Sequence, residues 1–303
     1  MKPSLLAAAL VAVSLVAFPS IAEEAKEPEV KATPIKGPLY FFQGRGGNVV
    51  ASIGEDGVLL VDADYAAYAP AHAAKARELS GNEAAPRFVL NTHWHFDHTE
   101  GNNFFGEQGS VIVAHENVRQ RMSSGQTIEA FNRVIEPSPK VALPVVTYGN
   151  SLALHFNGDD IEVQHYARGH TDGDSVVFFA AENVVHMGDL VFAKRFPFVD
   201  ISSGGNVFGA IDSIAAVLER IDDQTVVVPG HGAMTDKAGL AAYHEMLVAT
   251  SGQVTAALEA GKSLEEITAN GLGDQWESWG SGFIKEANWI SFIASSAYNR
   301  RSQ

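Results

Sequence analysis

Three histidines and one aspartate fall within six consecutive positions, 93 to 98, of the segment NTHWHFDHTEGN. Residues two apart in an extended backbone point to the same side, so His93, His95 and Asp97 share a direction. His98 follows where the chain should turn, and it can therefore face a second point nearby. Neutral imidazole and carboxylate are ligands that zinc accepts. Without a partner, so many clustered polar groups would destabilise a strand end, and the segment therefore predicts a metal site.

Three further ligand-type residues occur later in the chain, each in a glycine-containing loop that follows an apolar segment. His170 lies in RGHTDGDS, Asp189 in HMGDLVF and His231 in VPGHG. Strand ends are where a layered fold can gather side chains from distant parts of the sequence. We therefore expect these three residues beside the first cluster.

The elements that must position these residues alternate between short apolar strands and helices. Strand patterns occupy residues 41–42, 48–53, 58–64, 87–92, 110–115, 174–180, 183–189 and 225–232, and the hairpin signal NGDD joins 151–156 to 161–166. Helical patterns occupy 65–79, 115–134 with a break near 123–125, 207–221, 235–260 and 283–298. Two strand-rich halves, each with helices, predict two packed sheets covered by helices, an αββα sandwich.

The two ends of the chain differ from its centre. Residues 1–22 combine Lys2, an apolar run and small residues before Ala22, a pattern typical of a secretory signal peptide. The alternative, a retained membrane anchor, would need about 20 apolar residues. We expect a flexible lead-in at 23–36, the main domain at 37–237 and, at 238–303, a helical extension packed on the same domain. The mature protein is predicted to be periplasmic or secreted, with no stable membrane anchor after cleavage.

Composition narrows the classes of function. The chain contains no cysteine, which excludes a thiol nucleophile and thiolate metal ligands. After removal of residues 1–22 it would carry 20 lysines and arginines against 36 acidic residues, a net charge of −16. A polyanion is a poor electrostatic partner for such a protein, so we expect a small-molecule substrate and no nucleic acid. The oligomeric state stays open.

From about residue 41 to about residue 232, the sequence resembles the metallo-β-lactamase superfamily, with all its metal-binding elements in order. The closest similarity is to a B1-like metallo-β-lactamase with an aspartate at the bridging-ligand position. The resemblance implies a four-layer αββα fold with a two-metal site between the sheets. By that resemblance, the first metal is held by His93, His95 and His170, the second by Asp97, His98 and His231, and Asp189 bridges them.

The resemblance also implies the function. The protein is expected to be a binuclear zinc-dependent hydrolase that opens β-lactam amide bonds by a metal-bound hydroxide, weakly or promiscuously. Two close divalent ions lower the pKa of a shared water toward about 7 and polarise the carbonyl under attack. Asp97 is expected to orient the hydroxide as the catalytic residue. Because all donors are nitrogen or oxygen, iron or manganese are alternatives to zinc.

Residues around the ligands have predicted roles of their own. Lactamases with a cysteine ligand place a carboxylate-binding lysine three residues later, where this chain has Phe192, so Lys194 and Arg195 either take over that task or are solvated. Asn206 follows a glycine and is expected to contact the substrate or to cap the helix from residue 207. Asp62 is a candidate to orient a metal-binding loop.

Other functions remain open at this point. Aspartate at position 189 also looks like the pattern of glyoxalase-type thioesterases and lactonases, although no basic glutathione-binding region is recognisable in residues 238–303. A non-haem iron, oxygen-using enzyme on the same fold would use fewer ligands when it holds one iron. A binding protein with a structural zinc would surround the ion with four protein ligands in a closed shell. Seven ligands shared by two ions leave open coordination positions, which favours catalysis.

Overall fold

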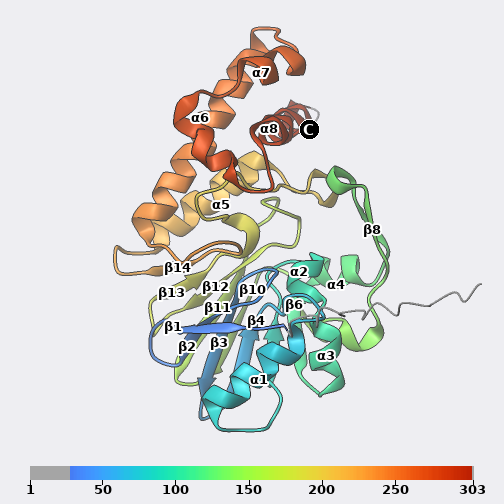
Figure 1. Cartoon of the computed structure of the whole chain (residues 1–303), viewed down its shortest axis with the longest axis vertical. Helices are drawn as coiled ribbons and strands as arrows, with labels where there is room; N and C mark the ends of the chain where they lie inside the picture. Colours follow the sequence, from blue (N-terminus) through green and yellow to red (C-terminus); the bar gives the residue numbers. More distant parts are fainter. Residues whose placement is uncertain (1–27, 302–303) are drawn as a thin grey trace, which may run out of the picture.

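Two β-sheets lie face to face in the computed structural model, which describes residues 28–301 (Figure 1). The predicted signal peptide lies outside that range. The seven-stranded sheet has the order β1 (Lys31–Pro34), β2 (Leu39–Gln43), β3 (Val49–Gly54), β4 (Gly57–Val61), β5 (Phe88–Leu90), β6 (Val111–His115) and β9 (Val146–Tyr148). The five-stranded sheet has the order β10 (Ser151–Phe156), β11 (Asp159–His165), β12 (Ser175–Phe179), β13 (Val184–His186) and β14 (Val226–Val228).

Helices cover the outer faces of both sheets, which confirms the predicted αββα architecture. Those of the first half are α1 (Ala69–Ser80), α2 (Phe96–Thr99), α3 (Asn102–Glu107) and α4 (Glu116–Met122). Those of the second half are α5 (Val207–Arg220), α6 (Lys237–Glu259), α7 (Leu264–Asn270) and α8 (Glu286–Arg301). Short 3-10 turns add η1 (Glu129–Phe131), η2 (Lys140–Ala142), η3 (Gly188–Leu190), η4 (Ile201–Ser203) and η5 (Asp274–Ser281).

The layers follow from the alternation of side chains along each strand. In β2, Phe41 belongs to the core between the sheets, and Phe42 belongs to the core beneath α1. In β3, Val50 and Val49 divide in the same way. Strands whose two faces are both covered in this manner are apolar throughout, as the sequence pattern requires.

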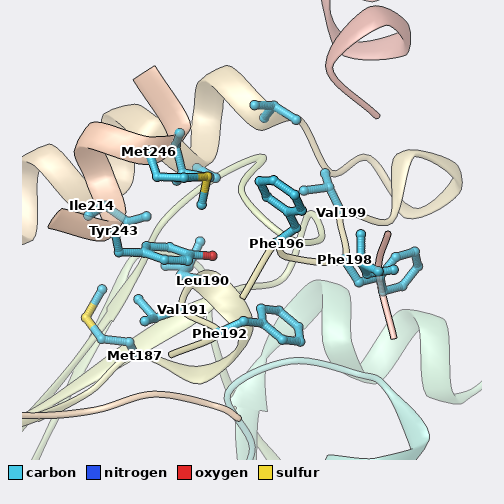
Figure 2. Packing of buried hydrophobic residues seen from close by; sticks show 14 of the residues in the cluster. Met187, Leu190, Val191, Phe192, Phe196, Phe198, Val199, Ile214, Tyr243 and Met246 are labelled. Carbon is cyan, nitrogen blue, oxygen red and sulfur yellow. The ribbon is translucent and has the colours of Figure 1, made fainter. Parts of the chain in front are cut away.

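The C-terminal helices α6, α7 and α8 gather at one end of the molecule (Figure 1), where α6 packs against α5 and β14, and α7 and α8 pack against α6. Figure 2 shows Tyr243 and Met246 of α6 beside Ile214 of α5 and Leu190 of η3. Trp289 of α8 is fully buried in the same core, and its indole N–H donates to the Thr250 hydroxyl. The extension therefore shares one continuous core with the loops that follow the sheet.

The structure differs from the predicted helix at 115–134. Helix α4 ends at Met122, and the chain then forms a two-stranded hairpin of β7 (Gln126–Ile128) and β8 (Arg133–Ile135). The break near 123–125 was predicted, but the helix does not resume. The β-branched residues after the break favour strands, and Asn132 takes the left-handed conformation that the turn needs, at φ 47°.

Part of the segment 23–36, expected to be a flexible lead-in, is regular structure. Residues Lys31–Pro34 form β1, an edge strand paired antiparallel with β2, so that Thr33 lies opposite Phe41. Val30 is buried just before it, and this contact explains why so polar a segment is ordered. Within residues 28–301, no helix combines the length and the apolar character needed to cross a membrane.

Candidate metal centre

The seven ligand-type residues meet at one edge of the two sheets. Strands β4, β5 and β6 run parallel, as do β13 and β14, so their carboxyl ends open on the same side. His93 and His95 follow β5, and Asp97 and His98 begin the short helix α2. The remaining three come from the loop after β11, from η3 after β13, and from the loop after β14: His170, Asp189 and His231.

The donor atoms form two groups, each with one ligand atom per residue within 4.8 Å of the others. The first contains His93, His95, His170 and Asp189, and all four are buried. In it, Nε2 of His170 lies 2.7 Å from Nδ1 of His95. The second contains Asp97, His98 and His231.

Asp189 stands between the two groups. Its Oδ2 lies 3.6 Å from Nε2 of His170 in the first group and 3.3 Å from Nε2 of His231 in the second. Its Oδ1 lies 3.1 Å from Nε2 of His98. The structure thus brings together all seven residues, in the grouping that the sequence resemblance implies.

Hydrogen-bond partners behind the histidines fix which ring nitrogen faces the cluster. Asp62 Oδ2 lies 2.8 Å from Nδ1 of His98, and the same carboxylate accepts from the Thr92 amide and hydroxyl, so it holds the start of the loop as well. Nδ1 of His170 lies 2.8 Å from the Phe198 carbonyl oxygen. Such partners set the tautomer of a ligating histidine.

Asp200 plays the same part for His95. Its Oδ2 lies 3.0 Å from Nε2 of His95, which leaves Nδ1 as the nitrogen that faces the cluster. Asp200 is buried and also accepts from the Ser202 hydroxyl and the Ser203 amide. Sequence reasoning missed this residue, because it lies 105 positions from His95 and nothing in its local sequence marks it.

Two glycines allow this close packing. A Cβ atom on Gly47 would overlap the imidazole of His98, and one on Gly230 would overlap Oδ1 of Asp189. The turn GRGGN and the loop VPGHG therefore contribute space as well as backbone flexibility.

Of the other histidines, His186 is buried with Nε2 3.1 Å from the Asn48 carbonyl oxygen, and its Nδ1 accepts from the Gly188 amide next to Asp189.

The donor set fits divalent cations. Nε2 of His93 is buried and has no hydrogen-bond partner among residues 28–301, although it faces the other donors. An unpaired buried polar atom costs about 1–3 kcal/mol, and a cation at this point would satisfy it. The imidazole and carboxylate donors therefore fit a metal centre.

The electrostatics of the two groups differ. Burial, together with the neighbouring His95, lowers the pKa of His170 to about 4, so its ring is neutral and ready to ligate. Burial also opposes charge on His231, but Asp189 and Asp97 outweigh it and raise the pKa of His231 to about 9. The carboxylates therefore attract positive charge to the second group, where a proton and a metal ion compete for the same nitrogen.

A cavity of about 410 Å³ opens in front of the donors, with His95, Asp97, Asp189 and His231 at its base. Six aromatic residues, three arginines and one isoleucine form its other walls. They comprise Arg45, Tyr65, Phe96, Ile128, Phe131, Arg133, Phe192, Arg195, Phe198 and Phe283. No local sequence pattern indicates that the hairpin β7–β8 or the segment before α8 reaches this place.

The three predicted substrate contacts separate in the structure. Arg195 lines the cavity in front of the donors, whereas Lys194 lines a neighbouring cavity of about 720 Å³ that Arg195 also borders. The Asn206 side chain accepts from the amides of Phe208 and Gly209 and so caps α5, and it does not line the donor cavity. Of the three, only Arg195 lines the cavity in front of the donors.

Comparison with known proteins identifies the class to which this fold and site belong. Residues 43–231 match the family described as the metallo-beta-lactamase superfamily. The chain belongs to the metallo-β-lactamase superfamily and is a metal-dependent hydrolase of that fold.

Relatives within this class differ in what they are named for. The alpha subunit of 2,4-dinitroanisole O-demethylase from Nocardioides sp. (strain JS1661) is 23% identical over 247 residues, which cover 80% of this chain and 69% of the relative. An uncharacterised protein of Mycobacterium leprae (strain TN) is 29% identical over 167 residues, 52% of this chain and 75% of that protein.

Solved structures agree on the fold. The DIM-1 metallo-β-lactamase superposes with a TM-score of 0.59 at 19% identity, covering 73% of this chain and 97% of that one. A double mutant of the sec-alkyl sulfatase PisA1 gives a TM-score of 0.68 at 16% identity, covering 90% of this chain and 50% of that one.

Proposed function

We propose that this protein is a binuclear zinc hydrolase that opens β-lactam amide bonds, with ester or thioester cleavage as a second activity of the same site. The observation that carries the proposal is the pair of donor groups sharing Asp189 at the base of an open cavity. A structural zinc site would be closed by its ligands, whereas here the donors border a space large enough for a substrate.

The proposed ligands are His93, His95 and His170 for one zinc and Asp97, His98 and His231 for the other, with Asp189 shared. When bound, two such ions supply an activated water and a Lewis acid for the scissile carbonyl. Asp62 and Asp200 hold His98 and His95 in the orientation that ligation requires.

Asp97 is the proposed catalytic residue because its carboxylate reaches both the donors and the cavity. Its side chain is 16% exposed, against 4% for Asp189, and its Oδ2 lies 3.3 Å from Nε2 of His231. A carboxylate in this position can orient the attacking water and receive its proton at Oδ2.

Recognition of the substrate anion is assigned to Arg195, which lines the cavity, with Lys194 in support from the adjoining one. The lysine spacing of the cysteine-type lactamases is missing, since Phe192 stands three residues after Asp189. Because binding that is equal in the ground state and the transition state affects KM more than kcat, we expect an elevated KM for β-lactams.

The second candidate is a thioesterase or lactonase of the glyoxalase type. Asp189 supports it, because a shared aspartate is the broader hydrolase pattern, and the relatives named for O-demethylation and alkyl sulfate cleavage act on bonds other than β-lactams. An iron, oxygen-using enzyme is less well supported, since two complete donor groups favour two ions.

We also propose that the protein is exported, on the evidence of its N-terminal residues 1–22. Mass spectrometry of protein from the native envelope should find a chain that begins near Glu23. A full-length chain that starts at Met1 in the membrane fraction would instead support a retained anchor.

The deciding experiment combines metal analysis with a panel of substrates. We expect two zinc ions per chain and chelator-sensitive hydrolysis of nitrocefin and a penicillin. A protein that holds two ions, is inert to penicillins, cephalosporins and carbapenems, and cleaves a thioester or lactone rapidly is the second candidate instead. One ion at full occupancy would contradict the two-metal site.

A further inference from the structure

The outer wall of the donor cavity is built by two segments that lie far apart in the sequence. Phe131 comes from η1 in the β7–β8 hairpin, and Phe283 comes from the stretch between η5 and α8. Their ring centroids lie 6.1 Å apart, and Phe131 lies 4.7 Å from Phe198. Phe192 completes the set at 6.2 Å from Phe283. We call Phe131, Phe192, Phe198 and Phe283 the aromatic wall.

The aromatic wall reaches the donors directly. The Phe192 ring stacks on the imidazole of His231, with centroids 5.1 Å apart and an interplanar angle of 17°. At the opposite end, Phe131 and Phe283 remain 45% and 57% exposed at the mouth of the cavity. Two large apolar rings held open to water beside a reactive site are available to cover an apolar group of the substrate.

The charged side chains in the cavity, apart from the metal donors, are all arginines: Arg45, Arg133 and Arg195. This contrasts with a chain whose net charge is −15. Arg133 is already engaged, with its guanidinium carbon 3.5 Å from the Phe96 ring centroid and its Nη2 3.7 Å from Glu100. Arg45 and Arg195 have no ion-pair partner among residues 28–301.

Arg195 is the arginine beside the aromatic wall. Its backbone amide donates to the Phe192 carbonyl, and its side chain passes the backbone of Gly282, the residue before Phe283. An unpaired guanidinium beside exposed rings can bind an anionic group while the rings bind an apolar one.

We propose that the site takes small anionic aromatic substrates, with the ring of the substrate packed against Phe131 and Phe283 and its anionic group on Arg195. This rests on the proposed hydrolase function, for which it specifies the substrate class. A cavity of about 410 Å³ is in the range that holds one such molecule. A penicillin with an aromatic side chain satisfies the requirement, and so does an ester that carries both an aryl ring and a free carboxylate.

Equilibrium binding tests the proposal without any turnover. The probes are 3-phenylpropanoate, hexanoate and 3-phenylpropan-1-ol, titrated by calorimetry into the zinc-loaded protein. We expect 3-phenylpropanoate to bind about tenfold more tightly than either of the others, since stacking on aromatic side chains and a charge-assisted bond each contribute that order. Hexanoate binding equally well would overturn the role of the rings, and equal binding of the alcohol would overturn the role of the anion.

Binding measurements on variants show which residues produce the preference for 3-phenylpropanoate over hexanoate and over the alcohol. Phe131→Ala and Phe283→Ala should each remove most of the preference for 3-phenylpropanoate over hexanoate. Arg195→Ala should remove the preference over the alcohol, and it also tests whether the metals alone hold the carboxylate. The matched control is Val134→Ala, an exposed apolar residue of the same hairpin that does not line the donor cavity. If the control weakens binding as much as Phe131→Ala does, the aromatic wall is not the binding surface.

Hydrolysis measured in parallel separates this proposal from the proposed function. If no substrate is cleaved but the binding preference persists and depends on Phe131, Phe283 and Arg195, the hydrolase function fails and the substrate class stands. If aliphatic and aromatic esters are bound and cleaved equally well, the function stands and the substrate class fails. Since Phe131 and Phe283 are exposed, their variants should fold, and thermal unfolding checks this.

Discussion

The inner and outer halves of the cavity are built by different principles. The inner half consists of mostly buried donors at strand ends, and hydrogen-bond partners such as Asp62 and Asp200 hold several of them from behind. The outer half consists of a hairpin and a segment of the C-terminal extension, with Phe131 and Phe283 exposed and in contact with each other.

This contrast separates the chemistry of the site from its selectivity. A metal site tolerates little displacement, so its ligands belong on rigid strand ends with a second layer of hydrogen bonds. Recognition of a substrate can change with the loops that surround such a scaffold, because loops tolerate sequence change better than strands. Relatives named for different reactions on one fold are consistent with this division.

The largest effect is expected from removing a donor of the inner half. His170→Ala should lower hydrolytic activity by more than about a hundredfold, because loss of a supporting partner alone costs about 10–100-fold. Metal analysis of the purified variant should find less than two ions per chain. His155→Ala is the matched control, since the His155 side chain is 80% exposed and belongs to neither donor group. Full metal content and activity in His170→Ala would exclude it as a ligand.

A partner behind the donors should have the next largest effect. Asp200→Asn keeps the shape but offers His95 an amide in place of a carboxylate, so zinc affinity should fall by about 10–100-fold. Competition with a chromogenic chelator measures this. Asp160→Asn, a change to an exposed aspartate, serves as the control. Equal zinc affinity in Asp200→Asn and wild type would mean that Asp200 does not orient His95.

The outer half should affect substrate binding rather than chemistry. Arg195→Ala should raise KM for an anionic substrate about tenfold with little change in kcat, as expected for a charge-assisted hydrogen bond made equally in both states. Lys194→Ala should have a smaller effect, because Lys194 lines only the neighbouring cavity. Steady-state kinetics on both variants measure the two KM values. A larger rise in KM for Lys194→Ala than for Arg195→Ala would mean that Lys194 is the main anion contact.

The smallest effect is expected outside both halves. Asn206→Ala removes the cap of α5 and should lower the free energy of unfolding by about 1 kcal/mol without changing KM. Denaturant unfolding measures the first quantity, and Asn206→Asp should restore most of it. A clear rise in KM for Asn206→Ala would instead indicate that Asn206 contacts the substrate.

Part of the fold was predictable because it depends on local patterns. The sequence predicts the strands with apolar runs, the hairpin at NGDD and the long helices α5 and α6. Burial of one face or both gives strands and helices a recognisable spacing of apolar residues. The hairpin β7–β8 was not predicted, because a helix break at residues 123–125 is compatible with either a second helix or a pair of strands after it. Strand β1 was also missed, since its pairing with β2 and the burial of Val30 outweigh a polar composition.

By itself, the sequence determined the seven donor residues as a set, because imidazole and carboxylate side chains at glycine-rich strand ends have few other uses. It also determined the layered architecture that gathers them. Only the tertiary structure decided which groups support and surround the donors. Asp200, Arg195, Phe131 and Phe283 reach the site through packing of segments far apart in the chain, and such contacts depend on the three-dimensional arrangement of the sheets and the C-terminal helices rather than on any local pattern.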